Sequence, residues 1–290
     1  MTEPLFRPAT EADAPGVAAL LTAHMNPKIP PQVFARILDY RWSGEKPHAG
    51  VVAEAGGEVV GYHGNVWSTR RIDGTDRLMG NFSSLYVRRD WRGHDLGLRM
   101  MRAYAAMPEP TFTVFNPSRR VHAILEACGF RDLDTHRRVW RFGDGGGGTE
   151  VVADPSEIAR AASAEERVYL DEHQGLPVHW RLLRGDGGAV LAGFLRQDRG
   201  DQGLCWDLIY AGDPKALAGL IHGAAPAILS GARRGVLQID ARFLGGHAPA
   251  GGALEPLQYR RMVRRGANAP PDHRIDHLYS ETLLLGLKIA

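Results

Sequence analysis

The sequence predicts an α/β protein: a mixed, mostly antiparallel sheet flanked by helices, built as two tandem copies of one domain. Short apolar runs and amphipathic stretches of the first half follow the order β-α-α-β-β-β-α-β-α-β-β, and the second half repeats much of it. Between the halves lies GDGGGG at 143–148, a run too rich in glycine to order cheaply. We therefore expect a first domain at 1–142, a linker at 143–148 and a second domain at 149–290.

The composition is typical of a folded protein with a sizeable core. Of the 290 residues, 44% are hydrophobic and 23% are charged, and the net charge of +2 gives no global reason to expect nucleic acid as a partner. Cys128 and Cys205 form neither a disulfide framework nor a pair at metal-ligand spacing, so we expect no metal and a reducing compartment. No signal peptide is evident, and no apolar run approaches the ~18 residues of a membrane span. We expect a cytoplasmic protein without a membrane partner.

Start signals and periodicity predict the N-terminal elements. They are a strand over 5–8, a helix over 12–24, a second helix from Pro31, and a β-hairpin over 50–74 whose second strand lies near 59–68. A capping-box variant formed by Thr10 and Asp13 marks the start of the first helix. Gly56 and Gly57 mark the turn of the hairpin.

The later elements of the first half surround a short loop. In chain order they are a strand over 77–87, the loop 90–98 (DWRGHDLGL), a helix near 96–107, a strand over 111–115, a helix opened by Asn116-Pro117-Ser118, and a strand over 136–142. The second half has helices over 155–173 and 213–231 and strands over 178–185, 189–197, 203–212, 235–240, 258–266 and 277–287. It has no counterpart of the arginine–glycine loop, as expected of a duplicated copy that has decayed.

The loop 90–98 has the features of a pyrophosphate site. It leads into a helix, and a helix N-terminus presents four unpaired backbone N–H groups and roughly half a positive charge. Gly93 and Gly97 allow a ligand to approach the backbone closely, and Arg92 adds a cationic donor. A plain strand–turn–helix is the alternative.

A longer pattern runs through 85–98 (LYVRRDWRGHDLGL) and 111–130 (TFTVFNPSRRVHAILEACGF). It resembles the GCN5-related N-acetyltransferase family, whose pattern is a strand ending in apolar-x-Val, Arg/Gln-x-x-Gly-x-Gly/Ala opening a helix, a second strand, an asparagine, and a helix closing in Gly-Phe. The matching positions are Arg92, Asp95, Gly97, Asn116 and the pair Gly129-Phe130. The resemblance covers about 5–142, whereas the second half follows only the element order, as a degenerate copy in a tandem member of the family does.

The resemblance implies the acyl-coenzyme A N-acyltransferase fold and a cofactor, acetyl-coenzyme A or another acyl-coenzyme A. In that fold two adjacent parallel strands splay apart, and the pantetheine arm of the cofactor lies between them. The implied cofactor-binding residues are Leu85, Tyr86, Val87, Arg92, Gly93, His94, Asp95, Leu96, Gly97, Leu98, Asn116 and Arg119. Several of them have alternative roles: Leu85 and Val87 as core strand residues, Asn116 as a helix cap and Arg119 as a solvated side chain.

Asp95 departs from the family pattern, which prefers glycine there. A carboxylate ~5 Å from a pyrophosphate charge costs about 3 kcal/mol at an effective dielectric of ~20, more than the ~0.3–1 kcal/mol that a helix dipole contributes. We therefore expect Asp95 to point away from the phosphates, toward Arg92 or Arg99, or to cap the helix. The alternative is a loop that has lost its affinity for the cofactor.

The usual catalytic side chains of the family are not evident. The tyrosine that commonly serves as acid corresponds to Leu125, and the strand before the loop has no carboxylate. Tyr86 and Tyr104 are candidate substitutes for the acid. His63 is a candidate base, because a histidine titrates near the working pH range. Each of these side chains also has a structural role open to it, in the core or on the surface.

The implied function is transfer of an acetyl group from acetyl-coenzyme A to the amine of a small molecule or amino sugar, by direct attack in a ternary complex. A non-catalytic acyl-coenzyme A-binding or interaction module is the first alternative. A transferase that uses aminoacyl transfer RNA is the second, although a net charge of +2 offers it no broad basic surface. The expected partner is a small-molecule amine rather than nucleic acid, and a homodimer is compatible with the sequence.

Overall fold

The computed structural model describes residues 3–42, 44, 46–92, 95–186, 188–200, 203–231 and 234–289. The chain forms two compact units. The first comprises the chain up to Arg131 with Arg261–Ala269 and Tyr279–Leu287, and the second comprises Asp132–Arg260, Pro270–Leu278 and the residues from Lys288. The C-terminal part of the chain therefore contributes to both units.

The first unit combines the N-terminal elements with the end of the chain. Its helices and 3-10 turns are η1 (Glu11–Asp13), α1 (Ala14–His24), α2 (Pro31–Phe34), η2 (Ala35–Ile37), η3 (Arg89–Trp91), α3 (Leu96–Ala105), α4 (Arg119–Ala127) and α8 (Glu281–Leu285). Its strands are β1 (Leu5–Pro8), β2 (Gly50–Ala55), β3 (Glu58–Ile72), β4 (Thr75–Val87), β5 (Thr111–Val114) and the last part of β12 (Ala253–Arg264). Up to α4 this is the predicted order of elements.

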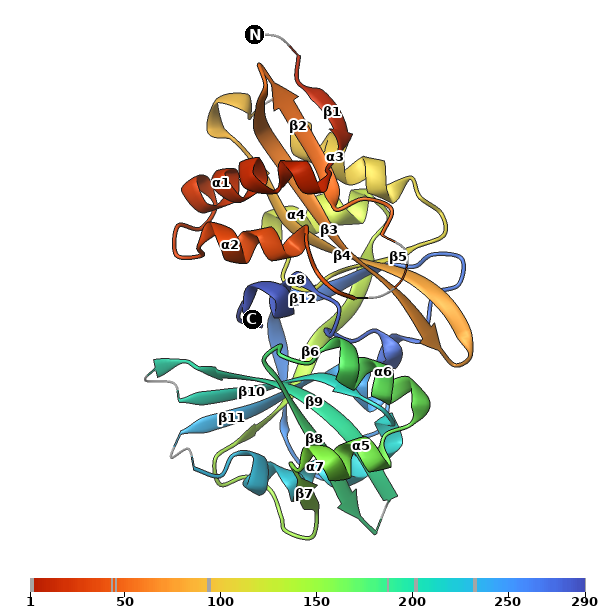
Figure 1. The fold of residues 1–290 in the computed structure, drawn as a ribbon. Helices are drawn as coiled ribbons and strands as arrows, with labels where there is room; N and C mark the ends of the chain where they lie inside the picture. Colours follow the sequence, from red (N-terminus) through yellow and green to blue (C-terminus); the bar gives the residue numbers. More distant parts are fainter. Residues whose placement is uncertain are drawn as a thin grey trace. The chain divides into compact units, whose positions relative to one another are not determined.

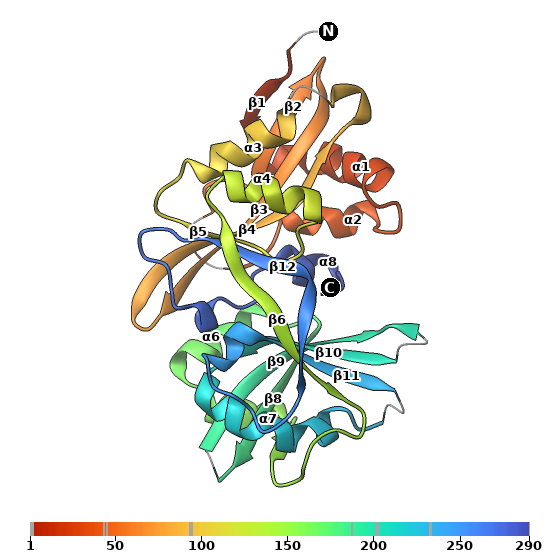
Figure 2. The same cartoon turned by 180° about the vertical axis from the view of Figure 1, so that it is seen from behind.

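The sheet of the first unit is antiparallel except at one pair of strands. Its order is β1-β2-β3-β4-β5-β12, and β4 and β5 run parallel. A parallel pair needs a crossover connection, which α3 supplies between β4 and β5. α1 and α2 lie over one face of the sheet and α3 and α4 over the other (Figure 1, and from behind in Figure 2).

Aromatic side chains fill the core of the first unit. Trp67 of β3, Tyr104 of α3 and Phe112 of β5 are at most 1% exposed. The ring of Phe82 in β4 lies 5.3 Å from that of Tyr104 and 5.2 Å from that of Phe112, centroid to centroid. α3 places its tyrosine in this cluster because its apolar residues recur at helical spacing along one face. β4 and α3 are thereby held together.

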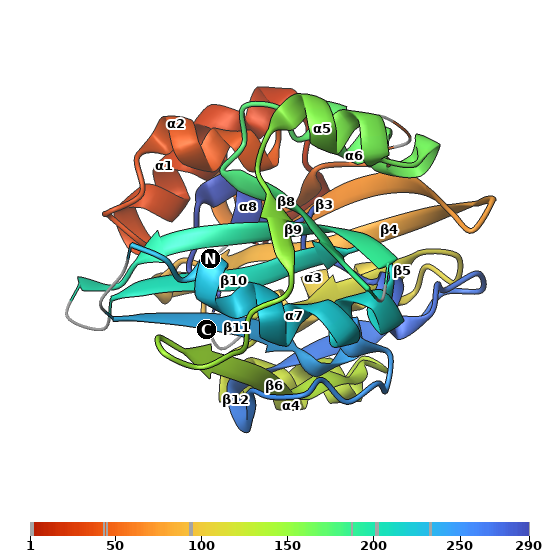
Figure 3. The ribbon, with the colours of Figure 1, turned by 90° about the horizontal axis from the view of Figure 1, so that it is seen from below.

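The second unit has the same layers. Its helices and 3-10 turns are α5 (Pro155–Ala161), α6 (Ala164–Glu172), α7 (Pro214–Ile228), η5 (Ala241–Leu244) and η6 (Asp272–Arg274), and its strands are β6 (Arg131–Arg141), β7 (Glu150–Val152), β8 (Val178–Gly185), β9 (Gly188–Asp198), β10 (Leu204–Ala211) and β11 (Gly235–Asp240). The order β6-β11-β10-β9-β8-β7 is antiparallel apart from the pair β10–β11. α5 and α6 lie over one face and α7 over the other (Figure 3).

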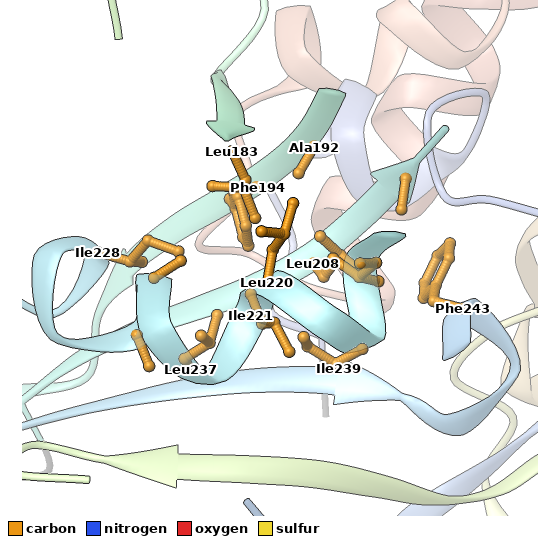
Figure 4. Packing of buried hydrophobic residues seen from close by; sticks show 14 of the residues in the cluster. Leu183, Ala192, Phe194, Leu208, Leu220, Ile221, Ile228, Leu237, Ile239 and Phe243 are labelled. Atoms are coloured by element: carbon orange, nitrogen blue, oxygen red, sulfur yellow. The ribbon is translucent and has the colours of Figure 1, made fainter. Parts of the chain in front are cut away.

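α7 supplies much of the core of the second unit. Leu220 and Ile221 of α7 lie among side chains of the strands, including Phe194 of β9 and Leu208 of β10 (Figure 4). Each of these four side chains is at most 3% exposed. Burying one such side chain contributes roughly 1.5–3 kcal/mol, so this cluster is a substantial part of what holds α7 on the sheet.

The mixed, mostly antiparallel α/β fold is confirmed, but two elements of the second half differ from the prediction. The predicted helix over 155–173 is interrupted before Ser163, whose capping box with Glu166 starts α6. The predicted strand over 277–287 instead contains the helix α8, which ends at a left-handed Gly286 with φ +63°. In both places local capping signals outweigh the apolar pattern.

The glycine-rich segment 143–148 lies within the second unit. The N–H of Gly146 donates to the carbonyl of His222 in α7 at 3.3 Å. The compact units therefore differ from a division at 142 and 149. The physical reason is strand pairing: β6 joins the second sheet through β11, while Tyr279–Leu287 belongs to the first unit.

The two cysteines of the chain are free thiols. Cys128 is half-buried, Cys205 is buried, and neither forms a disulfide. In the part of the chain that the structure describes, no group of His, Cys, Asp and Glu side chains could hold a metal ion. Among the same residues, no helix has the length and apolarity needed to cross a membrane.

Candidate functional site

The candidate site begins where β4 and β5 separate. Their parallel pairing joins 79–81 to 111–113 and stops there, although β4 continues to Val87. On this side, the backbone of 82–87 faces no strand among the described residues. Because free backbone N–H and C=O groups bind amides, the gap is an edge at which an extended ligand can add.

A β-bulge in β4 marks the inner end of the gap. In the register with β3, Ser84 and Leu85 together oppose the single residue His63. Ser84 has φ +34°, a left-handed conformation uncommon for residues other than glycine. Its N–H donates to Glu281 at 2.8 Å instead of to the ladder with β3. The bulge thus turns a backbone donor toward the gap.

A cavity of about 240 Å³ occupies this gap. Much of its wall is apolar, formed in part by Phe82, Leu85, Met101, Val114, Val121 and Leu125. Polar groups reach it from His63, Ser83, Ser84, Asn116, Ser118 and Glu281. A largely apolar cavity with a few convergent polar groups is the usual form of a small-molecule site.

Glu281 brings a carboxylate into the cavity from the end of the chain. Its Oε2 accepts hydrogen bonds from the N–H of Ser84 at 2.8 Å and from the hydroxyl of Ser84 at 3.1 Å. Its own N–H donates to Oδ1 of Asn81 at 3.1 Å, which fixes the start of α8 beside β4. Burial raises the pKa of Glu281 to about 7, although the two hydrogen bonds from Ser84 act to lower it.

His63 lines the cavity but is almost wholly buried, at 1% exposed. Its ring packs edge-on against Phe82 and Tyr104, with centroids 4.6 and 5.2 Å away. Nδ1 lies 3.0 Å from the Gly64 carbonyl, and Nε2 has no hydrogen-bond partner among the described residues. Burial lowers the pKa of His63 to about 4. The expectation that this histidine titrates near the working pH is therefore wrong, because the ring is neutral at pH 7.

The candidate acids do not line the cavity. The ring of Tyr86 stacks on His24 of α1 at 6.1 Å with 6° between the planes, and the Arg92 guanidinium lies 5.3 Å from its centroid. Tyr104 is buried in the core, and burial raises its pKa well above the ordinary value. Leu125, at the position of the family's tyrosine, does line the cavity.

Arg92 lies at the outer end of β4. Its Nε donates to the Val87 carbonyl at 3.0 Å, and the side chain remains exposed. An exposed guanidinium held in this way is available to an anion at the loop. Gly93 and His94, which the prediction groups with it, lie outside the described residues.

Asp95 precedes α3 in a left-handed conformation, with φ +52°. This geometry explains the family's preference for glycine, and aspartate is among the few other residue types that tolerate it. The carboxylate neither caps α3 nor pairs with a described residue, and Arg99 pairs instead with Glu3 at 3.1 Å. The predicted cap or arginine pair is therefore wrong, and no side chain caps the N-terminus of α3 within the described ranges.

The first turn of α3 lies beside the unpaired edge of β4. Leu96 is 2% exposed and packs in the core, and Leu98 is half-buried. A Cβ added to Gly97 would meet Leu85 at 3.8 Å and Val87 at 4.0 Å. The helix N-terminus and the strand edge are therefore neighbours.

Asn116 and Arg119 follow β5 on the other side of the gap. Asn116 lines the cavity, and its Oδ1 accepts a hydrogen bond from Nη1 of Arg261 at 3.0 Å. The N-cap of α4 is Ser118, whose Oγ accepts from the N–H of Val121 at 3.4 Å, so the alternative of Asn116 as the cap is wrong. Arg119 is exposed in the first turn of α4.

Sequence reasoning missed two residues of the site, Glu281 and Arg261. They are separated by 197 and 145 residues from their partners Ser84 and Asn116. Arg261 is 0% exposed and also donates to a backbone carbonyl at the end of β5, at 2.7 Å. The only local signal is Ser280-Glu281 before an apolar run that ends at a glycine. This pattern is compatible with a short helix, but it does not indicate which residues the helix contacts.

Comparisons with known proteins identify the fold. No protein-family model matches the sequence, and no curated protein matches it either. GCN5-related N-acetyltransferases from Anabaena variabilis and Kribbella flavida match the structure with TM-scores of 0.54 and 0.53 at 10% and 15% identity, over 90% of this chain and 72% and 71% of theirs. A probable N-acyltransferase from Enterococcus faecalis matches with a TM-score of 0.54 at 12% identity, over 91% of this chain and 73% of its own. The chain therefore has the fold of the GCN5-related N-acetyltransferases, as the sequence pattern predicted.

Proposed function

We propose that the first unit binds an acyl-coenzyme A and transfers its acyl group, most simply acetyl, to the amine of a small molecule or amino sugar. One observation carries the proposal: the parallel strands β4 and β5 separate around a cavity beside the uncapped N-terminus of α3. Coenzyme A has a pyrophosphate and an amide-bearing arm, which suit a helix terminus and a strand edge respectively. The fold shared with N-acetyltransferases supports this assignment.

The residues present fit such a ligand. The backbone of 85–87 would pair with the arm, and Asn116 would border the arm from the other side of the gap. The N–H groups at the start of α3, with the exposed Arg92 nearby, would hold the pyrophosphate. When bound, coenzyme A supplies the acyl group as a reactive thioester.

The cavity favours direct attack by the amine. Phe82, Val114 and Leu125 form apolar walls beside which the reacting groups would lie. Holding two reactants in contact provides much of the acceleration of such a transfer. Cys128 is half-buried and does not line the cavity, so an acyl-cysteine intermediate has no support in this geometry.

A non-catalytic acyl-coenzyme A-binding module is the second candidate. One observation favours it: Leu125 stands in the cavity wall where the family carries a tyrosine, so that position offers no hydroxyl to protonate a leaving thiolate. Such a module would bind the same ligand and leave the thioester intact.

Isothermal titration with acetyl-coenzyme A, followed by an assay of thiol release over a panel of primary amines, tests both candidates. We expect binding and amine-dependent release of thiol. Binding without release for every amine favours the module. The absence of binding, for acetyl and for longer acyl chains, contradicts both.

A cavity-filling variant tests where the ligand binds. Val121→Trp puts an indole into the cavity from α4, and we expect a loss of roughly 100-fold in affinity for acetyl-coenzyme A, or about 2.7 kcal/mol. Val168→Trp, at a position of α6 that is 48% exposed, is the matched control and should bind as the wild type does. Thermal melting checks that both variants fold. Unchanged binding by a folded Val121→Trp protein would place the ligand elsewhere.

A further inference from the structure

The carboxylate of Glu281 occupies the inner end of the cavity, where the bulge of β4 turns its backbone donor inward. We propose that Glu281, delivered by the C-terminal segment Tyr279–Leu287, is the general base that takes the proton from the attacking amine. This inference rests on the proposed acyl transfer and adds a residue that no sequence pattern around β4 supplies.

One oxygen of this carboxylate is free to meet a ligand. Oε2 accepts both hydrogen bonds from Ser84, whereas Oε1 accepts none from a described residue. Glu281 is only partly buried and lines the cavity, so Oε1 is open to a ligand there. The carboxylate is thus anchored by one oxygen and available through the other.

The carboxylate is held in place by its neighbours. The N–H of Glu281 donates to Asn81 at 3.1 Å. Two residues upstream of it, the ring of Tyr279 packs edge-on against Trp42 at 5.0 Å and lies 4.9 Å from the guanidinium of Arg70. A base held within hydrogen-bond reach of its target transfers protons more effectively than a mobile one.

The described side chains that line the cavity with Glu281 include no lysine or arginine. β4 offers the neutral donor Ser84, and β3 offers the uncharged Tyr62 and His63. The buried guanidinium of Arg70 in β3 lies against the ring of Tyr279 rather than in an ion pair with Glu281. Of the other elements packed against α8, α2 carries no ionisable side chain, and η2 carries Arg36, which is exposed. Among the described residues no cation forms an ion pair with this carboxylate, and burial raises the pKa of Glu281 to about 7, close to the value that suits a base at neutral pH.

The proton and electron balance of the transfer needs no further reactant. The amine nitrogen forms a bond to the acyl carbon, the carbon–sulfur bond breaks, and its electron pair leaves with the sulfur. The proton lost by the amine goes to Oε1 of Glu281. Glu281 then gives this proton to the departing thiolate, which is the stronger base because a thiol has a pKa of about 8.5. The carboxylate is thereby restored for the next turnover.

His63 is the competing base, since it lines the same cavity. The two groups predict different pH profiles. Burial lowers the pKa of His63 to about 4 and raises that of Glu281 to about 7. If Glu281 is the base, kcat rises with pH through an acidic limb near pH 7, and if His63 is the base, the limb lies near pH 4.

The test is Glu281→Gln in the full chain, because glutamine can still accept the hydrogen bonds from Ser84 but cannot take a proton. We expect kcat for amine-dependent thiol release to fall by roughly 10²–10⁴-fold, the limb near pH 7 to disappear, and the affinity for acetyl-coenzyme A to change little. Glu109→Gln, at an exposed position before β5, is the matched control and should behave as the wild type. Thermal melting establishes that both variants are folded.

Different results would overturn the proposed acyl transfer and the proposed role of Glu281. Failure of the wild type to bind acetyl-coenzyme A overturns the proposed function. Binding with a folded Glu281→Gln variant that keeps its kcat and pH limb overturns the role of Glu281 alone. If acetyl-coenzyme A binds and no amine of the panel releases the thiol, the non-catalytic module is favoured and the role of Glu281 as a base is overturned.

Discussion

The two units contain the same structural arrangement and use it differently. Each sheet has one described parallel pair, β4–β5 or β10–β11, and each pair separates after a short run of pairing. In each parallel pair, the strand that comes first in the chain has a bulge. The bulge lies at Ser84 and Leu85 in β4 and at Ile209 in β10. The backbone therefore prepares a gap in both units.

In the second unit, backbone and buried ion pairs occupy that place. The N–H of His277 donates to the carbonyl of Ile209 at 2.9 Å. Arg242 donates to the carbonyl of Ile275 at 2.6 Å and to Asp240 at 3.0 Å. In the first unit, a side-chain carboxylate meets the bulge and leaves a cavity of about 240 Å³. The same fold thus leaves a cavity where the gap stays open and forms a structural core where the chain closes it.

The helices that follow the two bulged strands differ in whether a side chain caps their N-terminus. α7 begins with Pro214 after Asp213, whose Oδ1 accepts from the N–H of Ala216 at 2.8 Å. α3 follows Asp95, whose side chain caps nothing in the described part of the chain. A helix that satisfies its own first N–H groups with a carboxylate has little to offer an anion, whereas α3 keeps that capacity.

The largest expected effect is the change of stability with pH that Glu281 causes in the first unit. Glu281 has a folded pKa of about 7 against an ordinary 4.5, so its contribution to stability is fully present below about pH 4.5 and is lost as the pH rises through 7. This loss is about 3 kcal/mol at most. We expect the wild type to lose this much relative to Glu281→Gln between pH 4.5 and 8 in urea unfolding. Equal losses in the two proteins would contradict the raised pKa, and Glu109→Gln serves as the control.

A smaller effect is expected at the capped helix of the second unit. Asp213→Ala removes the cap of α7 and should cost about 1 kcal/mol of unfolding free energy, measured in urea. Asp171→Ala, at an exposed position of α6, should change stability by less than about 0.5 kcal/mol. Because the proposed ligand site lies in the first unit, neither variant should alter the affinity for acetyl-coenzyme A. If the Asp213→Ala protein bound a second molecule of acetyl-coenzyme A, the cap of α7 alone would be what prevents the second unit from binding this ligand.

The smallest effect is expected at Asp95. Asp95→Asn removes a negative charge beside the helix N-terminus and keeps a residue type that tolerates φ +52°. We expect affinity for acetyl-coenzyme A to rise by roughly three- to tenfold at low ionic strength and the gain to shrink in high salt, because salt screens exposed charges. Asp73→Asn, at another aspartate with φ +51°, is the matched control. An unchanged affinity would mean that the Asp95 carboxylate does not act on the ligand.

The elements around the gap could be predicted from the sequence because their signals are local. The strand ending at Val87, the loop through Asp95 and the helix after Asn116 each carry start or stop residues within a few positions. The burial of His63 could not be predicted, since it depends on Phe82 and Tyr104 closing around it. Glu281 could not be placed because the apolar run after it is compatible with a strand or a helix, and its partner Asn81 is 200 residues away.

The segments after residue 260 belong alternately to the first and the second unit, and this has a consequence for biosynthesis. Domains form as the chain emerges from the ribosome, N-terminal parts first. The first unit takes Arg261–Ala269 and Tyr279–Leu287 from the far side of the second unit in the sequence. Its cavity therefore gains the Glu281 carboxylate only after the second unit's residues up to Leu278 have been made. No single cut between neighbouring residues releases either unit whole. Gene fusion or recombination at the glycine-rich run 143–148 would accordingly separate the loop of the first unit from its own carboxylate.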